Sequence, residues 1–304
     1  MPSLKAIRKR IASTKATQKI TRAMKMVAGA RLARAQQRIV AMRPYAVKTA
    51  EVLRSVAATM IVDGDTPNGH GHPLLARRPE KKALFLVFSA DRGLCGALNT
   101  NVNKSAERAW REKQDMGVDV SFATLGRKGR EYLGRRRANV VRDFAHIYEG
   151  LDLYKARTVA NWVVLRFQKA ECDSVYFVYN EFKSAITQRV VLERLLPLGE
   201  ETAADPNKVT HSGKSLGPSD FLYEPNQQAL LERLVPMYIE ISILRALLES
   251  QASFFGAQMT AMDAATRNAK EMIARYTLMY NRARQAAITK ELMEIIGGAE
   301  ALKE

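Results

Sequence analysis

The residues with the clearest chemical potential lie in one glycine-bearing turn, Ser89–Asn99. The turn follows the apolar run Ala83–Phe88 and precedes a helical segment, the place where doubly wound α/β domains hold phosphate groups. Its spacing lacks the third glycine of GxGxxG, no GK[ST] of a P-loop follows, and no acidic residue is placed for a ribose. Cys95 could act as a nucleophile if a helix N-terminus stabilised its thiolate. We interpret the segment as a tight strand-to-helix turn with a small packed thiol, and we predict no nucleotide site.

Two other groups of side chains have spacings that chemistry could use. His70 and His72 could ligate a metal, but the glycines and prolines around them and the lack of nearby carboxylate or cysteine ligands favour a flexible loop. Glu291 and Glu294 lie three residues apart on one helical face, where surface charge is the ordinary explanation. No nucleophile, base and oxyanion donor can be assembled. The sequence therefore predicts no catalytic residue, no metal site, no cofactor and no enzyme acting alone.

The composition describes a folded chain with a strong excess of positive charge. Hydrophobic residues make up 47% of the 304 residues, which is enough for a core, and no run of eighteen apolar residues could span a membrane. Cys95 and Cys172 lie far apart and suggest no disulfide framework, as in a reducing compartment. The formal charge of +17 requires a partner of opposite sign, namely nucleic acid, anionic lipid or an acidic protein.

The positive charge is concentrated at the N-terminus, where no acidic residue precedes Glu51. An arginine-rich, acid-free, amphipathic start is also typical of a mitochondrial transit peptide. The helical pattern continues too far for that, so we expect Met1 to open a structural helix directly. The segment Ser3–Met60 should form this helix, kinked or divided at Arg43 by Pro44. Its apolar positions are Ile7, Ile11, Ile20, Met24, Val27, Leu32, Ala35, Ile39 and Met42.

The last quarter of the chain, from about Asn226 to Ile296, predicts a long helix with a heptad seam. Such a period requires a partner helix wound around it with a left-handed supercoil. The N-terminal helix supplies this partner, and an antiparallel pair is the simplest topology. The predicted seam consists of Leu230, Leu234, Met237, Ile241, Leu244, Leu248, Phe255, Met262, Ala265, Ala269, Met272, Tyr276, Met279, Ala283 and Ala286.

The middle of the chain changes period and predicts a small α/β sandwich with a largely parallel sheet, similar to a Rossmann domain. Expected strands are Ala83–Phe88, Val118–Leu125, Asn139–Phe144, Ser174–Phe182 and Gln188–Leu195, and expected helices are Asn103–Met116, Lys128–Arg137 and Leu153–Ala170. The fold class is therefore a long antiparallel coiled coil with an inserted α/β domain. We divide the chain into an N-terminal shaft helix (1–61), a linker (62–82), the α/β domain (83–195), a loop and foot (196–225) and a C-terminal shaft helix (226–304).

Four stretches resemble the gamma subunit of F-type ATP synthases, and the resemblance covers essentially the full chain. Ile7–Ser13 and Thr17–Ala28 match the first shaft helix of that family, and Ser89–Gly96 matches its central domain. The most specific stretch is Ala283–Ala299, in which an Ile-Thr pair is followed at fixed spacings by two glutamates and Gly-Ala. The resemblance implies a rotor in the central stalk, which couples proton-driven rotation of the c-ring to conformational cycling of catalytic beta subunits.

The resemblance also implies partners and contact residues. The partners would be three alpha and three beta subunits, the epsilon subunit and the c-ring, through which the chain would be peripheral to a membrane; nucleic acid is not among them. The residues implied at the beta subunits are Met24, Arg284, Gln285 and Thr289. Those implied at the foot, near the c-ring and epsilon, are Arg31, Arg34, Arg38, Tyr223 and Glu224.

Two alternatives remain open from the residues. A basic coiled coil that binds nucleic acid would explain the charge. It would not explain the α/β insertion or the C-terminal motif, and the basic stretch lacks aromatic residues for base stacking apart from Tyr45. For location, we expect the cytoplasmic face of a bacterial inner membrane, with the matrix face of the mitochondrial inner membrane as the alternative.

Overall fold

The computed structural model describes residues 3–62, 73–76, 78–198 and 227–301. These residues form two compact units. One unit comprises Met1–Ala30 and Gln258–Glu304, and the other comprises Arg31–Ala257. Two long helices, α1 (Leu4–Val62) and α5 (Gln227–Ala301), each contribute to both units. The predicted helical pair at the two ends of the chain is therefore present, and each unit is described here by itself.

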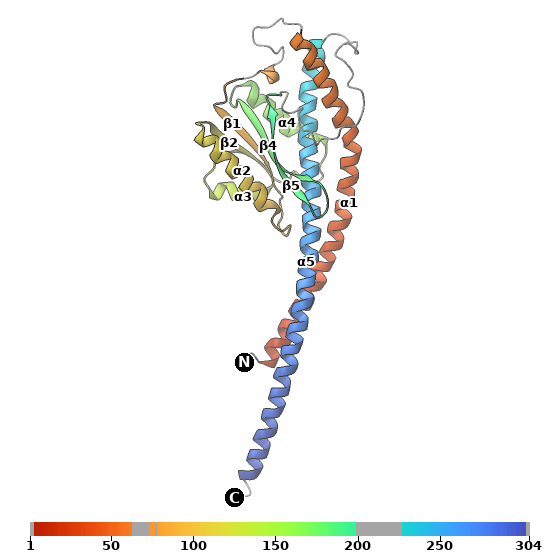
Figure 1. The fold of residues 1–304 in the computed structure, drawn as a ribbon, viewed down its shortest axis with the longest axis vertical. Coiled ribbons are helices and arrows are strands. Elements are labelled where there is room, and N and C mark those ends of the chain that lie inside the picture. Colours follow the sequence, from red (N-terminus) through yellow and green to blue (C-terminus); the bar gives the residue numbers. More distant parts are fainter. Residues whose placement is uncertain (1–2, 63–72, 77, 199–226, 302–304) are drawn as a thin grey trace. The chain divides into compact units, whose positions relative to one another are not determined.

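The larger unit contains one five-stranded sheet in the order β3-β2-β1-β4-β5 (Figure 1). β1 to β4 pair in parallel, and β5 pairs with β4 in the antiparallel sense. The strands are β1 (Lys82–Phe88), β2 (Asp119–Leu125), β3 (Val140–Phe144), β4 (Ser174–Phe182) and β5 (Gln188–Leu196). The remaining helices are η1 (Pro73–Leu75), α2 (Leu98–Asp115), α3 (Arg127–Arg135) and α4 (Leu153–Gln168). The predicted α/β class with a mainly parallel sheet is confirmed.

Helices cover both faces of the sheet, which explains the continuous apolar run in β1. Side chains alternate between faces along a strand. Leu84, Leu86 and Phe88 belong to the core shared with α4 and α5. Phe85 and Val87 belong to a second core with α2 and α3. A strand buried on both faces cannot show the alternation of apolar and polar residues that marks a half-exposed strand.

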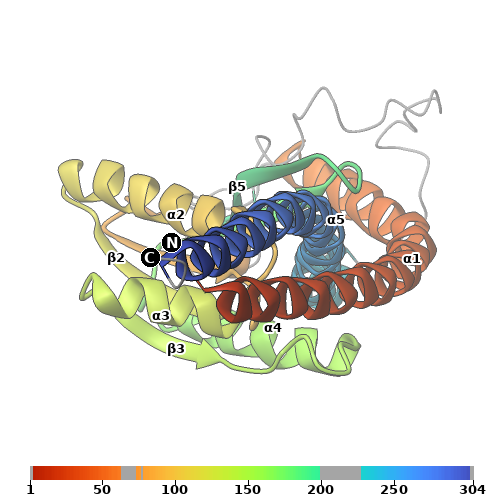
Figure 2. The same cartoon turned by 90° about the horizontal axis from the view of Figure 1, so that it is seen from below.

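The part of α5 before Gln258 is buried on more than the one side that a coiled-coil seam requires. Val235, Ile239, Ile243, Ala246 and Leu247 are fully buried in the same core as α4 and the sheet, and Ile39 and Met42 of α1 pack against this core. Figures 1 and 2 both show β5 beside this stretch of α5. The sequence predicted only a seam toward α1 here, whereas this stretch also forms a layer of the α/β domain.

A polar contact fixes α5 to the edge strand. Arg245 Nη2 donates to both carboxylate oxygens of Glu193 on β5, at 3.0 and 2.9 Å. Arg245 lies deep in the packed region, and its burial lowers the pKa of the guanidinium. The opposing charges and dipoles led by Tyr179 and Glu193 outweigh burial and raise the pKa. An ion pair of this kind costs desolvation energy, so its clearest effect is to fix the helix against the sheet in one register.

In the smaller unit, the seam between α1 and α5 differs from the predicted one at every second position. Met272 and Met279 were predicted to be buried, yet their side chains are 51% and 43% exposed. Ala265 is half-buried and Ala286 is exposed. The least exposed positions instead follow the heptad Met262, Thr266, Ala269, Ile273, Tyr276, Tyr280, Ala283 and Ala287. On α1 the matching positions are Ile7, Ile11, Thr14, Gln18, Thr21 and Ala28, whereas Ile20 and Val27, two of the apolar positions that indicated this helix in the sequence, are exposed.

Polar contacts between the two helices explain this register. Thr266 Oγ1 donates to Thr21 Oγ1 at 2.8 Å, and Arg8 donates to the Tyr280 hydroxyl at 2.9 Å. Two heptad registers one residue apart were both compatible with apolar and small side chains on α5. The observed register provides partners for the polar seam residues, which the hydrophobic pattern alone could not reveal.

Of the two predicted effects of Pro44, a kink or a division of the helix, the division does not occur, because a single helix α1 runs from Leu4 to Val62. Proline inside a helix removes one hydrogen bond and crowds the preceding turn, so surrounding packing must maintain the helix. Ile39 and Met42 before the proline and Val52 after it pack against the same core. This packing on both sides accounts for the continuous helix.

Candidate functional site

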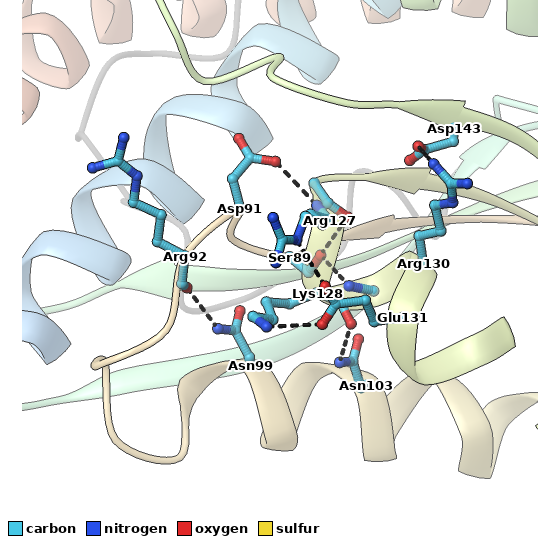
Figure 3. Close-up of polar contacts among 12 residues, drawn as sticks. Ser89, Asp91, Arg92, Asn99, Asn103, Arg127, Lys128, Arg130, Glu131 and Asp143 are labelled. Carbon is cyan, nitrogen blue, oxygen red and sulfur yellow. Dashed lines mark hydrogen bonds and ion pairs between the residues drawn. The ribbon is translucent and has the colours of Figure 1, made fainter. Parts of the chain in front are cut away.

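Hydrogen bonds join the turn after β1 to the segment that follows β2 (Figure 3). The Ser89 hydroxyl donates to the Gly126 carbonyl at 3.0 Å and accepts from the Gly129 amide at 2.7 Å. Asp91 accepts from the Arg127 amide at 3.0 Å and so occupies the N-terminus of α3. Two amide donors at the start of α3 are therefore taken by side chains of the chain itself.

Gly126 shows how closely the neighbouring segments approach at this edge of the sheet. Its φ of +107° lies in the region that favours glycine, and an added Cβ would lie 2.0 Å from the Ser89 carbonyl oxygen. Ser89 is itself buried. The space between the ends of β1 and β2 is thus filled by backbone and by one hydroxyl, which supports the interpretation of a packed turn.

Cys95 is a packed thiol and not an activated nucleophile. Its side chain is buried and accepts a hydrogen bond from Asn99 Nδ2 at 3.2 Å. Burial raises the pKa of the thiol and outweighs the opposite effects of Asn99 and Lys128. Burial likewise raises the pKa of the Cys172 thiol to about 11. Both thiols are free in the structure and are protonated at neutral pH.

The charged residues beside the turn are paired with one another. Lys128 and Arg127 both contact Glu131, at 2.8 and 2.7 Å, and Arg130 contacts Asp143 at 3.1 Å (Figure 3). Hydrogen bonds from Lys128 and Arg127 lower the pKa of Glu131 to about 2. A carboxyl group with such a low pKa does not serve as a general base near neutral pH. Nothing in this cluster combines a nucleophile with a base.

The residues expected at the beta subunits lie in the smaller unit. Met24 is half-buried on α1, whereas Arg284, Gln285 and Thr289 are exposed near the end of α5. The Thr289 hydroxyl donates to the Gln285 carbonyl of its own helix at 3.0 Å. Arg284, Gln285 and Thr289 therefore lie on one stretch of α5. Within the described residues, the Arg284 guanidinium and the Gln285 side-chain amide form no hydrogen bond or ion pair.

The same stretch of α5 exposes large apolar side chains, which the sequence analysis did not single out. Figure 1 shows α5 continuing beyond the first turn of α1. Glu291 and Glu294 are exposed, and Glu294 pairs with Lys290 at 3.5 Å, which agrees with ordinary surface charge. A helix with this many exposed apolar groups is typical of an interaction surface. The exposed apolar residues are Ile288, Leu292, Met293, Ile295 and Ile296.

The three arginines expected at the foot lie in the larger unit. Arg31, Arg34 and Arg38 line one wall of a pocket beside Arg92 of the β1–α2 turn. Their spacing of three and four residues was visible in the sequence, but their proximity to Arg92 depends on the fold. Tyr223 and Glu224, the other expected foot residues, lie outside the described residues, as do His70 and His72.

Comparisons with known proteins agree over the whole length of the chain. A profile of the ATP synthase family matches residues 3–302. The ATP synthase gamma chain of Sorangium cellulosum (strain So ce56) is 54% identical, and the comparison covers 100% of both chains. The chain belongs to the ATP synthase gamma chain family. A further gamma chain, from Geotalea uraniireducens (strain Rf4), is 46% identical, again over 100% of both chains.

Solved structures of ATP synthase chains have the same fold as this chain. A chain of the Euglena gracilis mitochondrial ATP synthase, solved as an OSCP/F1/c-ring assembly in rotational state 3, has a TM-score of 0.65 at 20% identity. That comparison covers 98% of this chain and 94% of the other. A chain from the Tetrahymena thermophila mitochondrial ATP synthase central stalk has a TM-score of 0.61 at 24% identity and covers 81% of this chain and 99% of the other.

Membership in the gamma chain family confirms the resemblance inferred from the sequence motifs. The alternative of a nucleic-acid-binding coiled coil receives no support from these comparisons. None of the described helices combines the length and the apolar character that crossing a bilayer requires. Within the described ranges, no three histidine, cysteine or acidic side chains cluster as metal ligands would.

Proposed function

We propose that this chain is the central-stalk rotor subunit of an F-type ATP synthase and that it couples c-ring rotation to the catalytic cycle of the beta subunits. The observation that carries the proposal is the end of α5, where the family motif lies on a helix that exposes both apolar and charged side chains. The relatives are named as gamma chains of ATP synthase, and the neighbouring structures are titled as central-stalk, rotor or F1/c-ring assemblies.

The chain would perform this role without catalytic residues of its own. An asymmetric helical pair inside a ring of three alpha and three beta subunits would contact each catalytic site differently. A contact can shift the conformational equilibrium of a site only by the free energy that differs between its states. Moving a site from 1:99 to 99:1 takes about 5.5 kcal/mol, which a few charged contacts and apolar packing could supply. The occupied turn at Ser89 and the protonated thiol of Cys95 support a non-catalytic role.

We assign the contact with the beta subunits to Met24, Arg284, Gln285 and Thr289. Their support is the exposure of the last three and the charge of α1 around Met24. That part of α1 carries exposed Lys19 and Arg22 and no acidic residue, so an acidic loop of a partner would be attracted to it. Charge complementarity allows contacts to form and break without deep apolar burial, as a moving contact requires.

We assign contact with the c-ring and epsilon subunit to Arg31, Arg34 and Arg38, with Tyr223 and Glu224. The exposure of the three arginines supports their part of this assignment. We also retain the division of the chain at residues 61, 82, 195 and 225 as a proposal for its functional parts. The chain would then be peripheral to a bacterial inner membrane on its cytoplasmic side, bound there through the c-ring.

The test adds charge at one proposed beta contact and removes it at another. Met24→Lys would add an ion pair worth about 0.2 to 1 kcal/mol at a contact that must stay weak in every rotor position. ATP hydrolysis should continue while the proton pumping linked to it falls, because one angular state becomes too stable. Arg284→Ala should instead slow turnover by weakening a contact that distinguishes beta states.

Both activities should be measured in the same inverted membrane vesicles, at low and high salt. Met26→Lys adds the same charge on another, exposed face of α1, and Arg282→Ala removes a neighbouring exposed arginine, so these are matched controls. Equal losses of hydrolysis and pumping in Met24→Lys, or a defect that ignores salt, would refute the electrostatic account. Purification of tagged chain after nuclease treatment should recover ATPase subunits in fixed ratio, and recovery of nucleic acid alone would contradict the rotor proposal.

A further inference from the structure

A pocket of about 480 Å³ lies in the larger unit, beside the Ser89–Asn99 turn. Four segments line it: the arginine stretch of α1, the turn after β1, the loop before α4, and α5 near Phe254. A volume of this size is within the range of sites for small molecules. Its lining combines apolar side chains with several hydrogen-bond donors and two carboxylates.

Arginine side chains supply most of these donors. Arg31, Arg34 and Arg38 follow one another at spacings that place them on one face of α1, and Arg92 joins them from the turn. Within the residues that the structure describes, none of the four forms an ion pair, and Arg31 contacts only the Phe255 ring, at 5.9 Å from the centroid. Like charges gathered in this way repel one another unless an anion lies between them.

The two carboxylates in the lining have other contacts. Asp91 accepts from the Arg127 amide at 3.0 Å, and Glu149 lies 3.4 Å from the His146 ring nitrogen. Counting both as ionised, the lining still carries more positive than negative charge, since four arginines face two carboxylates. The excess favours an anionic ligand.

Two buried hydroxyl groups provide a second, independent observation. Ser250 is 5% exposed, and neither its hydroxyl nor that of Tyr148 has a hydrogen-bond partner of normal geometry in the described residues. Burial raises the pKa of Tyr148, the negative charge of Asp91 raises it further, and the nearby Ser250 hydroxyl lowers it by a smaller amount, so the phenol remains protonated and can donate. A buried hydroxyl without a partner is costly, and a native structure usually satisfies it with water or a ligand.

We propose that this pocket binds a phosphoryl oxyanion, either inorganic phosphate or the phosphate of a nucleotide, between the four arginines and the hydroxyls of Ser250 and Tyr148. All of these groups are donors, and a tetrahedral anion has oxygens directed to several sides at once. A planar carboxylate would satisfy a single arginine fork and leave the others unpaired. Phe254 and Phe255 form an apolar part of the wall, against which a nucleotide base could pack.

The test uses the full-length chain and titration calorimetry with sodium phosphate, and separately with ADP, at constant ionic strength. Replacing Arg34 and Arg38 together by Gln should weaken phosphate binding about tenfold or more, because charge-assisted hydrogen bonds are the strong ones. The control replaces Arg22 and Arg43 by Gln. This makes the same charge change on α1 at exposed arginines that do not line the pocket, and it should leave binding unchanged.

Ser250→Ala separates binding from folding. It removes a buried hydroxyl without a partner, so the unfolding temperature without ligand should stay the same or rise. Phosphate binding should nevertheless weaken, by about tenfold. A loss of affinity in a variant that is as stable as the parent cannot be attributed to unfolding.

The two titrations distinguish the sources of the phosphoryl group. Equal affinities for phosphate and ADP, with competition between them, identify the phosphoryl group alone as the ligand. Tighter binding of ADP that still depends on Arg34, Arg38 and Ser250 identifies a nucleotide, and would show that the prediction of no nucleotide site beside the Ser89–Asn99 turn is wrong. Equal weakening in the control variant, or no binding of either compound at millimolar concentration, overturns the proposal. In the second case an acidic segment of a partner protein becomes the better candidate. Arg31, Arg34 and Arg38 are also assigned to the contact with the c-ring and epsilon subunit, but the isolated chain is titrated without these partners, so a failure of anion binding would leave the rotor proposal standing.

Discussion

The seam between α1 and α5 can be tested with two alanines of the same helix. Ala269 is 5% exposed in the seam, whereas Ala274 faces outward. Ala→Asp lowers helix propensity by the same amount at both sites, about 0.7 kcal/mol or less. At Ala269 the larger side chain also overfills the seam, which costs about 1 to 3 kcal/mol. The buried carboxylate adds at most about 4 kcal/mol at pH 7, because a greater penalty would raise its pKa above 7 and the group would bind a proton.

Ala269→Asp should therefore destabilise the helical pair by about 3 kcal/mol or more beyond Ala274→Asp, and this difference should depend on pH. The pKa of the buried aspartate is raised in the folded state. Its penalty is full above that pKa and is relieved as the pH falls toward the unfolded value of about 3.9. Hydrogen exchange of the α5 amides between Gln258 and Tyr280, measured at pH 7 and near pH 5, would report both effects for this unit alone.

Met272→Asp separates this register from the one predicted by the sequence. If the observed register is right, this variant should resemble Ala274→Asp in the isolated chain, since Met272 is 51% exposed. Faster exchange in Met272→Asp than in Ala269→Asp, or equal exchange in Ala269→Asp and Ala274→Asp, would show that the seam has been assigned to the wrong face of α5.

Three further substitutions probe the α/β domain and the residue Glu80 just before it. Gly126→Ala should unfold or severely destabilise it, by about 3 kcal/mol or more, because the new Cβ would lie 2.0 Å from the Ser89 carbonyl oxygen. Gly134→Ala, with open space around it, should be neutral or stabilising when both variants are compared by urea unfolding. Burial raises the pKa of Glu80, but donors led by Lys113 outweigh burial and lower it below 4.5. Its ionised form therefore stabilises the fold above about pH 4.5, and this contribution is lost as the pH falls through the lower folded pKa. Glu80→Gln should make unfolding less dependent on pH in that range, and an unchanged pH profile would contradict this ion pair.

The sequence predicted the α/β elements closely, because each strand and helix there has one dominant period. β4 was predicted at its observed bounds, Ser174–Phe182. The start of α2 was missed by one turn, since Leu98–Asn101 has the composition of a loop. Asn99 in that turn bonds back to Ala90 and Arg92, so its side chain serves the preceding turn while its backbone is already helical.

The predicted seam failed where hydrophobicity and packing disagree. Met272 and Met279 are apolar and continue the heptad spacing from Met262, so the pattern selects them although apolar Ile273 and Leu278 are adjacent. The structure instead turns Ile273 and Tyr280 toward α1, where Tyr280 accepts a hydrogen bond from Arg8. Pairing between two helices depends on both sequences at once, and a pattern read on one helix cannot choose between neighbouring registers.

The arginine pocket could not have been found from spacing alone. Arg31, Arg34 and Arg38 are near neighbours in sequence, but Arg92, Tyr148 and Ser250 approach them only because the sheet places the turn, the loop and α5 together. That these arginines form no ion pair within the described part of the chain is likewise a property of the folded chain.

The burial of α5 against the sheet has a consequence for how the chain is made. A ribosome releases the five strands and α4 well before it releases Val235, Ile239 and Ile243, which cover the same core. Until then, the apolar face formed by Leu84 and Leu86 lacks one of its covering layers. A nascent chain in that state exposes a surface that favours aggregation or chaperone binding. Translation to about residue 257 is thus a threshold for the α/β domain: ribosome-bound chains stalled before it should be protease-sensitive throughout the sheet, and those stalled well after it should be protected.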